Sequence, residues 1–432
     1  MEENFLLHTN GARAIYDAVK DLPLIDFHNH ISVSDIAADR RYEDLCDIWL
    51  SCDPYKHRLM RICGIDEHYI TGDASGFEKY SKFCEIFPLL AGNPVYDWSR
   101  MELSRIFGIE ELPSKDTARV IWDTANERLR SSEYSTQAIL SRFCIEYQSP
   151  VAALTDDLSC FDGKSTAPSL RGDNLLLPDE KLLERLKKET GKEITDTDSY
   201  IAAVSLLLDR FSAAGCRFAD HSLDTGFFEG EQGAKKAELL CRLGVEYAAR
   251  GWTLLLHIGA KRKTSERLAR LAGPAGGYAA AGKSFDTDAL CDLLGSMETR
   301  GGLPDTVLFP LNMSDQAVLA VMQGSFSEDG TLSKVQLGPA WWWCDHAFGI
   351  EHTLSSIASF GVLSAFIGMT TDSRSILSFV RHDYFRRLLA SWIDTQNTKG
   401  DWALTPPLQA EIARRICYEN AKEKIKIRGA KQ

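Results

Sequence analysis

Short apolar runs bounded by turn-forming residues recur along the chain and predict eight β-strands. The predicted strands are residues 22–30, 150–156, 166–171, 216–221, 252–258, 305–311, 334–338 and 365–371. Apolar residues with the helical period separate most of them. The predicted helices are residues 176–190, 198–214, 232–250, 286–299, 314–323, 350–360 and 375–396. Alternating strands and helices imply a parallel sheet, and eight such units predict an α/β fold of the closed (β/α)₈ barrel type. A doubly wound open sheet is the alternative, which the absence of a glycine-rich phosphate loop after any early strand disfavours.

About 120 residues separate the first predicted strand from the second, which is too long for an ordinary connection. This stretch is rich in aromatic residues and arginine, and we interpret residues 31–145 as a mainly helical insertion that covers the barrel mouth. Its predicted helices are residues 44–50, 78–87, 98–107 and 115–130. The remaining residues, 1–30 and 146–432, are predicted to form the barrel.

Polar side chains follow most of the predicted strands, always at the same end. In a parallel barrel the carboxyl ends of all strands meet at one mouth, so these side chains are expected to converge there. The set comprises His28, His30, Thr155, Asp156, Asp157, Arg171, Asp220, His221, His257, Asn312, the run Trp341–Trp343, Asp372 and Arg374. This convergence is the main argument from the residues themselves that the chain is an enzyme.

His28 and His30 lie two residues apart in the first strand, so their side chains point to the same face. This spacing alone is a weak signal. The last predicted strand, however, brings Asp372 to the same mouth. Two neutral imidazoles and one carboxylate suit a divalent ion with coordination positions left open for substrate. Arg374, together with Arg171 in an otherwise acidic protein, indicates an anionic substrate.

Several of these residues also have a purely structural interpretation. His221 could hydrogen-bond Asp220 or a backbone carbonyl, and His257 could be a core histidine, although its position at the mouth favours function. At least one residue of the run Trp341–Trp343 is expected to pack in the core. Arg381 lies in the helix after the eighth strand, where it either supports the site or faces solvent.

The amino-acid composition limits which binding partners and which cellular compartment are expected. The net charge of −12 at pH 7 argues against nucleic acid and anionic membranes as partners. No apolar stretch approaches the roughly 20 residues of a transmembrane helix, and residues 1–20 lack the basic start and apolar core of a secretory signal. The 11 scattered cysteines, without Cys-x-x-Cys spacing, are typical of buried reduced thiols. We therefore expect a cytoplasmic protein.

The chain also resembles a known family, the uronate isomerases, which form the glucuronate isomerase family of the amidohydrolase superfamily. The matching segments, in family order, are DFHNH (26–30), DPYKHRLMR (53–61), NPVYDWSRMEL (93–103), TDD (155–157), PSLRGD (168–173), GCRFADHSLD (215–224), LLHIGA (255–260), VLFPLN (307–312), VQLGPAWWW (335–343) and GMTTDSRS (368–375). The resemblance implies a distorted (β/α)₈ TIM-like barrel with one divalent metal ion, zinc or else manganese. It further implies interconversion of aldose-type and ketose-type hexuronates, such as D-glucuronate with D-fructuronate or D-galacturonate with D-tagaturonate.

The motifs of the family carry over to individual positions of this chain. The matched residues are the metal ligands His28, His30 and Asp372, the catalytic tyrosine Tyr55, the active-site arginine Arg374 and the carboxylate-binding Arg171. We expect the substrate-binding set to be completed by His57, His221, His257, Trp342 and Arg381. The fourth strand ends in ADHS, without the bridging lysine of many superfamily hydrolases, which favours one metal ion over two.

The chain departs from the family at one motif in the insertion. The family usually reads Asp-His-Tyr-Lys-Trp-Arg, whereas residues 53–58 read Asp-Pro-Tyr-Lys-His-Arg. Pro54 removes a titratable side chain and a backbone donor. Either His57 replaces the lost contact from a different angle, or the substrate differs.

Aldose–ketose interconversion needs a base for the C2 proton, an electrophile that stabilises the enediolate, and an anchor for the distant carboxylate. The metal ion would be the electrophile. Arg171 is the expected anchor, assisted by Arg374 or His57. The base is Asp372 or Tyr55, and Tyr55 would need a phenol acidified by the metal or by arginine.

Two other functions remain open at this point. One is a metal-dependent hydrolase or lyase on the same barrel that acts on a lactone, an amide or another sugar acid. The other is a catalytically silent homologue that binds a sugar acid or serves a partner. The expected partner is a small hexuronate, and the aromatic content of the insertion is compatible with a homo-oligomer.

Overall fold

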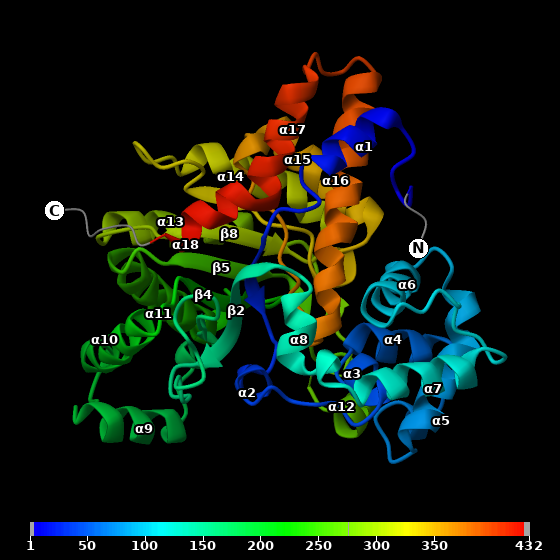
Figure 1. The fold of residues 1–432 in the computed structure, drawn as a ribbon. Coiled ribbons are helices and arrows are strands. Elements are labelled where there is room, and N and C mark those ends of the chain that lie inside the picture. Colours follow the sequence, from blue (N-terminus) through cyan, green and yellow to red (C-terminus); the bar gives the residue numbers. More distant parts are fainter. Residues whose placement is uncertain (1–3, 275, 427–432) are drawn as a thin grey trace.

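The computed structural model describes residues 4–274 and 276–426, so the ends of the predicted barrel ranges, 1–3 and 427–432, and Ala275 lie outside the described residues. Within this part of the chain, seven parallel strands form one curled sheet in the order β1-β2-β3-β4-β5-β8-β9 (Figure 1). The strands are β1 (Leu24–Asn29), β2 (Ile145–Ala153), β3 (Ser169–Arg171), β4 (Phe218–Leu223), β5 (Thr253–Ile258), β8 (Asp305–Pro310) and β9 (Val335–Leu337). Their order in the sheet follows the chain, without the reversal that defines a doubly wound sheet.

The parallel pairing places the carboxyl ends of neighbouring strands at one edge of the sheet. For example, β4 pairs with β5 in continuous register from Phe218 opposite Thr253 to Leu223 opposite Ile258. All residues of β5 are buried, which explains why its sequence is a continuous apolar run rather than an alternating pattern. Side chains that follow the strands therefore gather at the same edge.

The predicted eighth strand, residues 365–371, is not a strand, and this part of the prediction is wrong. The segment nevertheless lies beside β1, because the backbone N–H of Asp372 donates to the carbonyl of His28 at 3.1 Å. A regular ladder does not form, since Gly368 (φ +87°) and Asp372 (φ +47°) both leave the extended region. The result is a TIM-like sheet of seven strands with an irregular segment against its first strand.

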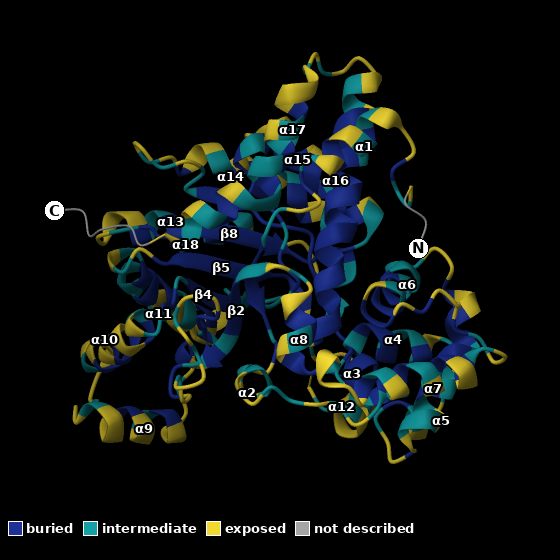
Figure 2. Ribbon diagram, viewed as in Figure 1, coloured by how far each residue is buried: buried dark blue, intermediate teal, exposed yellow. Residues whose placement is uncertain are grey.

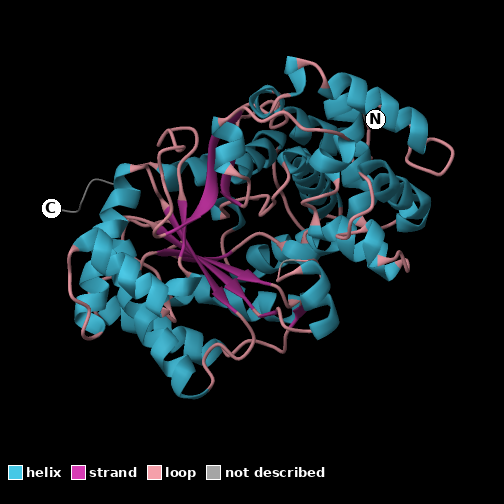
Figure 3. Ribbon diagram, turned by 90° about the horizontal axis from the view of Figure 1, so that it is seen from below, coloured by secondary structure: helices cyan, strands magenta, loops and turns pink. Residues whose placement is uncertain are grey.

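Helices connect most consecutive strands and surround the sheet, whereas β2 and β3 are joined by a loop (Figure 3). Those matching the predicted helices of this part are α9 (Glu180–Thr190), α10 (Thr197–Ala213), α11 (Gly230–Ala249), α13 (Thr287–Thr299), α14 (Gln316–Ser325), α15 (Ala347–Phe360) and α16 (Val380–Thr398). The predicted helix over 375–396 begins as a 3₁₀ turn, Ile376–Phe379, before α16. Elements without a prediction are α1 (Asn10–Asp17), α12 (Glu266–Ala272), α17 (Pro406–Arg414), α18 (Asn420–Ile425) and the antiparallel pair β6 (Ala260–Lys261) and β7 (Ala280–Ala281).

Between β1 and β2 the chain is mainly helical. The helices are α2 (Val33–Ala37), α3 (Leu45–Trp49), α4 (Pro54–Ile62), α5 (Gly76–Ile86), α6 (Pro94–Phe107), α7 (Ala118–Leu129) and α8 (Thr136–Ser141). Helices α3 to α7 lie together at one side of the sheet (Figure 1). Of these, α4 has no counterpart among the predicted helices, and it carries Tyr55.

Burial follows the layers of the fold. The strands and the inner faces of the helices are buried, whereas the outer turns and much of α9 are exposed (Figure 2). In the described part of the chain, no helix combines the length and the apolar character needed to cross a membrane.

Candidate active site

A cavity of about 500 Å³ opens at the carboxyl edge of the sheet, within the size range of small-molecule sites. The strand ends and the segment after residue 371 contribute His28, His30, Arg171, Asp220, Ser222, His257, Trp341, Trp342, Asp372, Ser373 and Arg374. Helix α4, helix α11 and the segments between strands and helices contribute Pro54, Tyr55, Asp173, Leu176, Asp224, Phe227, Lys236, Arg262 and Pro274. Most of the predicted site residues therefore meet in one cavity.

The imidazoles of His28 and His30 face the carboxylate of Asp372. Asp372 Oδ1 lies 3.2 Å from His28 Nε2 and 3.1 Å from His30 Nε2. Burial opposes ionisation of Asp372, but the hydrogen bonds to the two histidines hold its pKa well below the usual value. The carboxylate is thus ionised at neutral pH. Two imidazole nitrogens and one carboxylate oxygen, all within 4.8 Å of one another, form a donor set that fits a divalent metal ion.

Asp26 has no predicted role, yet its carboxylate holds the Asp372 turn against β1. It is fully buried and accepts hydrogen bonds from Thr371 N (2.6 Å), Thr371 Oγ1 (2.8 Å) and Thr370 Oγ1 (2.9 Å). Thr370 Oγ1 in turn accepts a hydrogen bond from the backbone N–H of His28 at 2.9 Å. The sequence signal for this residue is an acid inside an apolar strand, which must find partners when it is buried.

Asp220 and His257 form a buried pair on the adjacent strands β4 and β5. His257 Nδ1 lies 2.5 Å from Asp220 Oδ1, and His257 Nε2 has no hydrogen-bond partner among the described residues. Burial opposes ionisation of Asp220, but His257 and His28 hold its pKa well below the usual value. A His257 that donates from Nδ1 to Asp220 keeps Nε2 as an acceptor for a ligand. Together with His28, the pair forms a second set of ligand atoms within 4.8 Å of one another.

Tyr55 enters the cavity wall from the first turn of α4. Asp53 caps this helix by accepting from the backbone N–H groups of Tyr55 (2.9 Å) and Lys56 (3.2 Å), and Pro54 occupies the first helical position, where no N–H is needed. The Tyr55 hydroxyl donates to Asp345 Oδ2 at 2.8 Å. Burial and the nearby Asp345 carboxylate raise the pKa of Tyr55 well above 10, so its phenol is neutral rather than acidified.

The cavity carries more positive charge than the sequence predicted. The cationic side chains among the described residues that line it are Arg171, Lys236, Arg262 and Arg374. Arg262 is held by the Asp224 carboxylate at 3.0 Å and lies 5.5 Å from the ring centroid of Trp342. Arg262 follows β5 only shortly after its end. If the search for polar residues after each predicted strand had covered the whole of the following loop, it would have identified Arg262.

Comparison with known proteins places these features in a family. The family model for glucuronate isomerase matches residues 1–237 and 229–424. The chain belongs to the glucuronate isomerase family. A uronate isomerase of Caldanaerobacter subterraneus subsp. tengcongensis is 36% identical, over 98% of each chain. The crystal structure of uronate isomerase from Thermotoga maritima has a TM-score of 0.91 at 26% identity and covers 99% of both chains. Glucuronate isomerase from Caulobacter crescentus shares the fold, with a TM-score of 0.88 at 22% identity, over 100% of this chain and 99% of its own.

The departure from the glucuronate isomerase motif can now be located. Pro54 itself lines the cavity, at the position where the family usually has histidine. His57, further along α4, is 6% exposed and is not among the described residues that line the cavity. Burial lowers the pKa of His57 to about 4, so its imidazole is neutral. The geometry therefore gives no support to the idea that His57 replaces the lost contact.

Two other residues of the predicted substrate-binding set also lie behind the cavity wall. His221 is fully buried, with Nε2 2.9 Å from the Tyr247 hydroxyl. Arg381 is 2% exposed, lies over the ring of Trp98 at 3.9 Å from its centroid, and donates to Asp345 at 3.3 Å. Neither is among the described residues that line the cavity.

Proposed function

We propose that this member of the glucuronate isomerase family interconverts an aldose-type hexuronate and its ketose-type isomer. The observation that carries the proposal is the meeting, in one cavity, of His28, His30 and Asp372 with several cationic side chains. A hexuronate has a carbonyl and a neighbouring hydroxyl at one end and a carboxylate at the other, so it suits a site with these two kinds of group. The full-length similarity to uronate isomerases supports the same activity.

The same three side chains are our proposed holders of one divalent ion. Their two imidazole nitrogens and one carboxylate oxygen favour zinc, with manganese as the alternative. When bound, the ion supplies a Lewis acid at the carbonyl and hydroxyl oxygens of the substrate.

Each of the remaining tasks has a proposed residue in the cavity. Arg171 binds the substrate carboxylate, assisted by Arg374, because a guanidinium can meet a carboxylate with two parallel hydrogen bonds. Asp372, as an ionised carboxylate, takes the proton from C2 and returns it at C1. Tyr55, as a neutral phenol, exchanges protons with the substrate oxygens.

The arrangement of domains is part of the same proposal. The described residues of the ranges 1–30 and 146–432 form a distorted (β/α)₈ barrel, in which the irregular segment after residue 365 takes the place of the eighth strand. Residues 31–145 form a helical insertion that places Pro54 and Tyr55 over the mouth of the barrel.

The deciding experiment is proton NMR of the purified, zinc- or manganese-supplemented protein with a panel of hexuronates in D₂O. The expected result is a ketose product that has gained no water and carries deuterium at C1, where the proton is returned, together with deuterium at C2 of the aldose re-formed by the reverse reaction. A hydrolase would instead add water to its substrate, and failure to convert any hexuronate would refute the proposal. Treatment with a chelator should abolish turnover, and addition of zinc or manganese should restore it.

Variants test the assigned residues. We expect Asp372→Asn and Arg374→Met to lower kcat by about 100-fold or more while the circular dichroism spectrum stays unchanged. Asp123→Asn and Arg119→Met are matched controls, because this pair is exposed on α7 and should leave turnover unchanged. Near-normal turnover in both site variants would refute the assignment.

A further inference from the structure

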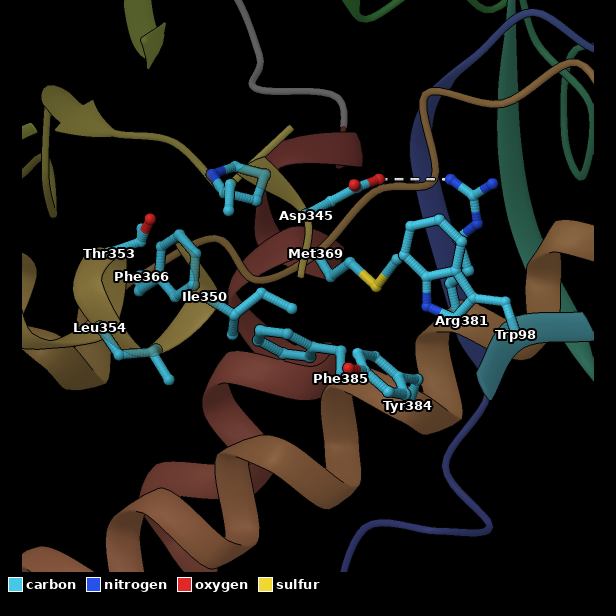
Figure 4. A pocket seen from close by; sticks show the side chains of 12 residues that line it. Trp98, Asp345, Ile350, Thr353, Leu354, Phe366, Met369, Arg381, Tyr384 and Phe385 are labelled. Carbon is cyan, nitrogen blue, oxygen red and sulfur yellow. Dashed lines mark hydrogen bonds and ion pairs between the residues drawn. The ribbon is translucent and has the colours of Figure 1, made fainter. Parts of the chain in front are cut away.

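A hydrogen bond of Tyr55 connects the large cavity with the lining of a second, narrow cavity. Tyr55 lines the large cavity, and its hydroxyl donates to Asp345. Asp345 is absent from the described lining of the large cavity and instead lines a narrow cavity of about 10 Å³ (Figure 4). The remainder of that narrow cavity is mostly apolar, with Trp98, Met369 and Phe385 among its walls. Asp345 is therefore not placed to touch a substrate in the large cavity, and its hydrogen bond to that cavity's lining comes from Tyr55.

The Asp345 carboxylate is incompletely compensated for a buried charge. It is 9% exposed, and its side-chain donors are the Tyr55 hydroxyl at 2.8 Å and Arg381 Nη1 at 3.3 Å. Arg381 is itself spread over the faces of two aromatic rings, at 3.9 Å from the centroid of Trp98 and 4.7 Å from that of Tyr55. Burial accordingly raises the pKa of Asp345 to about 7.

A second Tyr–Asp–Arg cluster, which like the first includes an arginine of α16, provides a comparison within the chain. Asp383 accepts hydrogen bonds from the Tyr16 hydroxyl, from Arg105 Nη2 at 2.7 Å and from Arg387 Nε at 2.6 Å. It thus has two arginine partners where Asp345 has one, and it does not line the large cavity. The Asp383 cluster has the composition and the pairing of a structural ion pair. The Asp345 cluster has the same composition with weaker pairing, and its tyrosine, Tyr55, lines the large cavity.

On the basis of the proposed isomerase function, we propose that Asp345 is a positioning residue that orients the Tyr55 hydroxyl and accepts its proton when Tyr55 takes a proton from a substrate hydroxyl. In this exchange the substrate O–H bond breaks and its proton bonds to Tyr55 Oη, while the electron pair stays on the substrate oxygen. The former Tyr55 O–H bond breaks at the same time, and that proton bonds to Asp345 Oδ2. The reverse exchange protonates the neighbouring substrate oxygen and restores both residues.

This exchange explains how Tyr55 can transfer protons without forming a phenolate. The pKa of Tyr55 lies well above 10, so a free phenolate would be costly in this environment. A phenol that gains one proton as it loses another stays neutral throughout, and the negative charge passes from Asp345, next to Arg381, to the substrate oxygen. The titratable and charged groups around Asp345 are Tyr55, Arg381, Tyr384, Cys344 and Asp372, with Asp53 acting on Arg381.

The test uses Asp345→Asn, Tyr55→Phe, the double variant and the control Asp383→Asn in the full-length, metal-supplemented enzyme. We expect Asp345→Asn to lower kcat by about 10- to 100-fold with KM changed less than about twofold, because the substrate does not touch Asp345. The double variant should be no slower than Tyr55→Phe, since the two residues act as one unit. Asp383→Asn should lower the melting temperature without this specific loss in kcat.

The pH dependence gives a readout that a purely structural role would not change. Asp345 must be ionised to accept the proton, so kcat should rise with pH through about 7 in the wild-type enzyme, and this limb should be absent in Asp345→Asn. If Asp345→Asn does not fold, kcat in H₂O–D₂O mixtures replaces it. The wild type should show a curved dependence, from two protons in motion, and Tyr55→Phe a weaker, linear one.

The outcomes separate this inference from the function on which it rests. A wild-type enzyme that converts no hexuronate refutes the proposed function, and the inference with it. An active wild type refutes the inference alone if Asp345→Asn has normal kcat, if it keeps the pH limb, or if its effect adds fully to that of Tyr55→Phe. A linear dependence of the wild-type kcat on D₂O content refutes it as well.

Discussion

Replacement of Asp26 by asparagine tests whether the turn that carries Asp372 is held by a single buried carboxylate. Besides its bonds to the two threonines, Asp26 accepts from Asn29 Nδ2 at 2.8 Å, and His382 Nε2 lies 3.2 Å from it. The variant is almost isosteric, but one oxygen becomes an amino group that can only donate. Its effect therefore reports hydrogen bonding and charge rather than packing.

The expected loss in the free energy of unfolding depends on which hydrogen-bond donors lose their acceptor. If the amino group takes the Oδ2 position, it faces the amino group of Asn29, and the Thr371 hydroxyl can turn to accept. Asn29 cannot reverse its amide without cost, because its oxygen accepts from Ile31 N at 3.1 Å. One buried donor thus stays unpaired, at about 1–3 kcal/mol, and the remaining bonds lose their charge assistance, at about 1 kcal/mol more. We expect a loss of about 2–4 kcal/mol in the free energy of unfolding.

The assay is urea unfolding followed by tryptophan fluorescence, with initial-rate measurements on the same preparations. Thr371→Val is the matched control, because it removes the hydroxyl bond but keeps the stronger backbone N–H bond, and it should lose about 1 kcal/mol. Asp372 holds its position at φ +47°, so release of the turn should also lower kcat/KM by about tenfold or more. An Asp26→Asn protein that loses less than 1 kcal/mol and keeps its turnover would refute the reasoning.

Two further predictions concern other buried charges. Lys56 is 1% exposed and lies 2.9 Å from Asp53 and 3.0 Å from Glu102. Lys56→Met leaves these two buried carboxylates without their partner, so the free energy of unfolding in urea should fall by about 3–5 kcal/mol. A loss below 1 kcal/mol would show that the carboxylates are compensated by other groups. The pKa values of Asp220 and Asp372 in the folded protein lie below the usual 3.8. The stability that their ionised carboxylates contribute is therefore present above about pH 4 and is lost as the pH falls towards those lower pKa values. The free energy of unfolding should accordingly fall between pH 4 and pH 2 more steeply in the wild type than in Asp220→Asn, and equal slopes would contradict this.

Much of the fold and part of the site were predictable from local patterns. The apolar runs located β1, β4, β5, β8 and β9 well, because strands buried on both faces need continuous apolar sequence. The strand-end rule brought His28, His30, His257 and Asp372 to one cavity. The helices of the barrel were found with shifted ends, since capping residues rather than the apolar period set where a helix begins.

The errors arose where long-range contacts override a local pattern. Residues 365–371 have the composition of a strand, but the hydrogen bonds with β1 and the positive φ angles of Gly368 and Asp372 give them another path. Helix α4 is short and depends on its Asp53 cap, so its apolar period was too brief to recognise. Tyr55 entered the candidate site through family resemblance, not through its spacing.

What the sequence determined by itself is the order of the seven strands of the sheet and of most helices between them, together with the identity of the groups at the strand ends, because both depend on periodicities of a few residues. Only the tertiary structure decided which groups face the cavity and which lie behind it. His57, His221 and Arg381 are behind the wall, whereas Arg262 is in it. Asp345 is connected to the site by its hydrogen bond with Tyr55, which lies 290 residues away in the sequence. Contacts at that separation depend on how the whole chain closes around the cavity, and no local pattern encodes them.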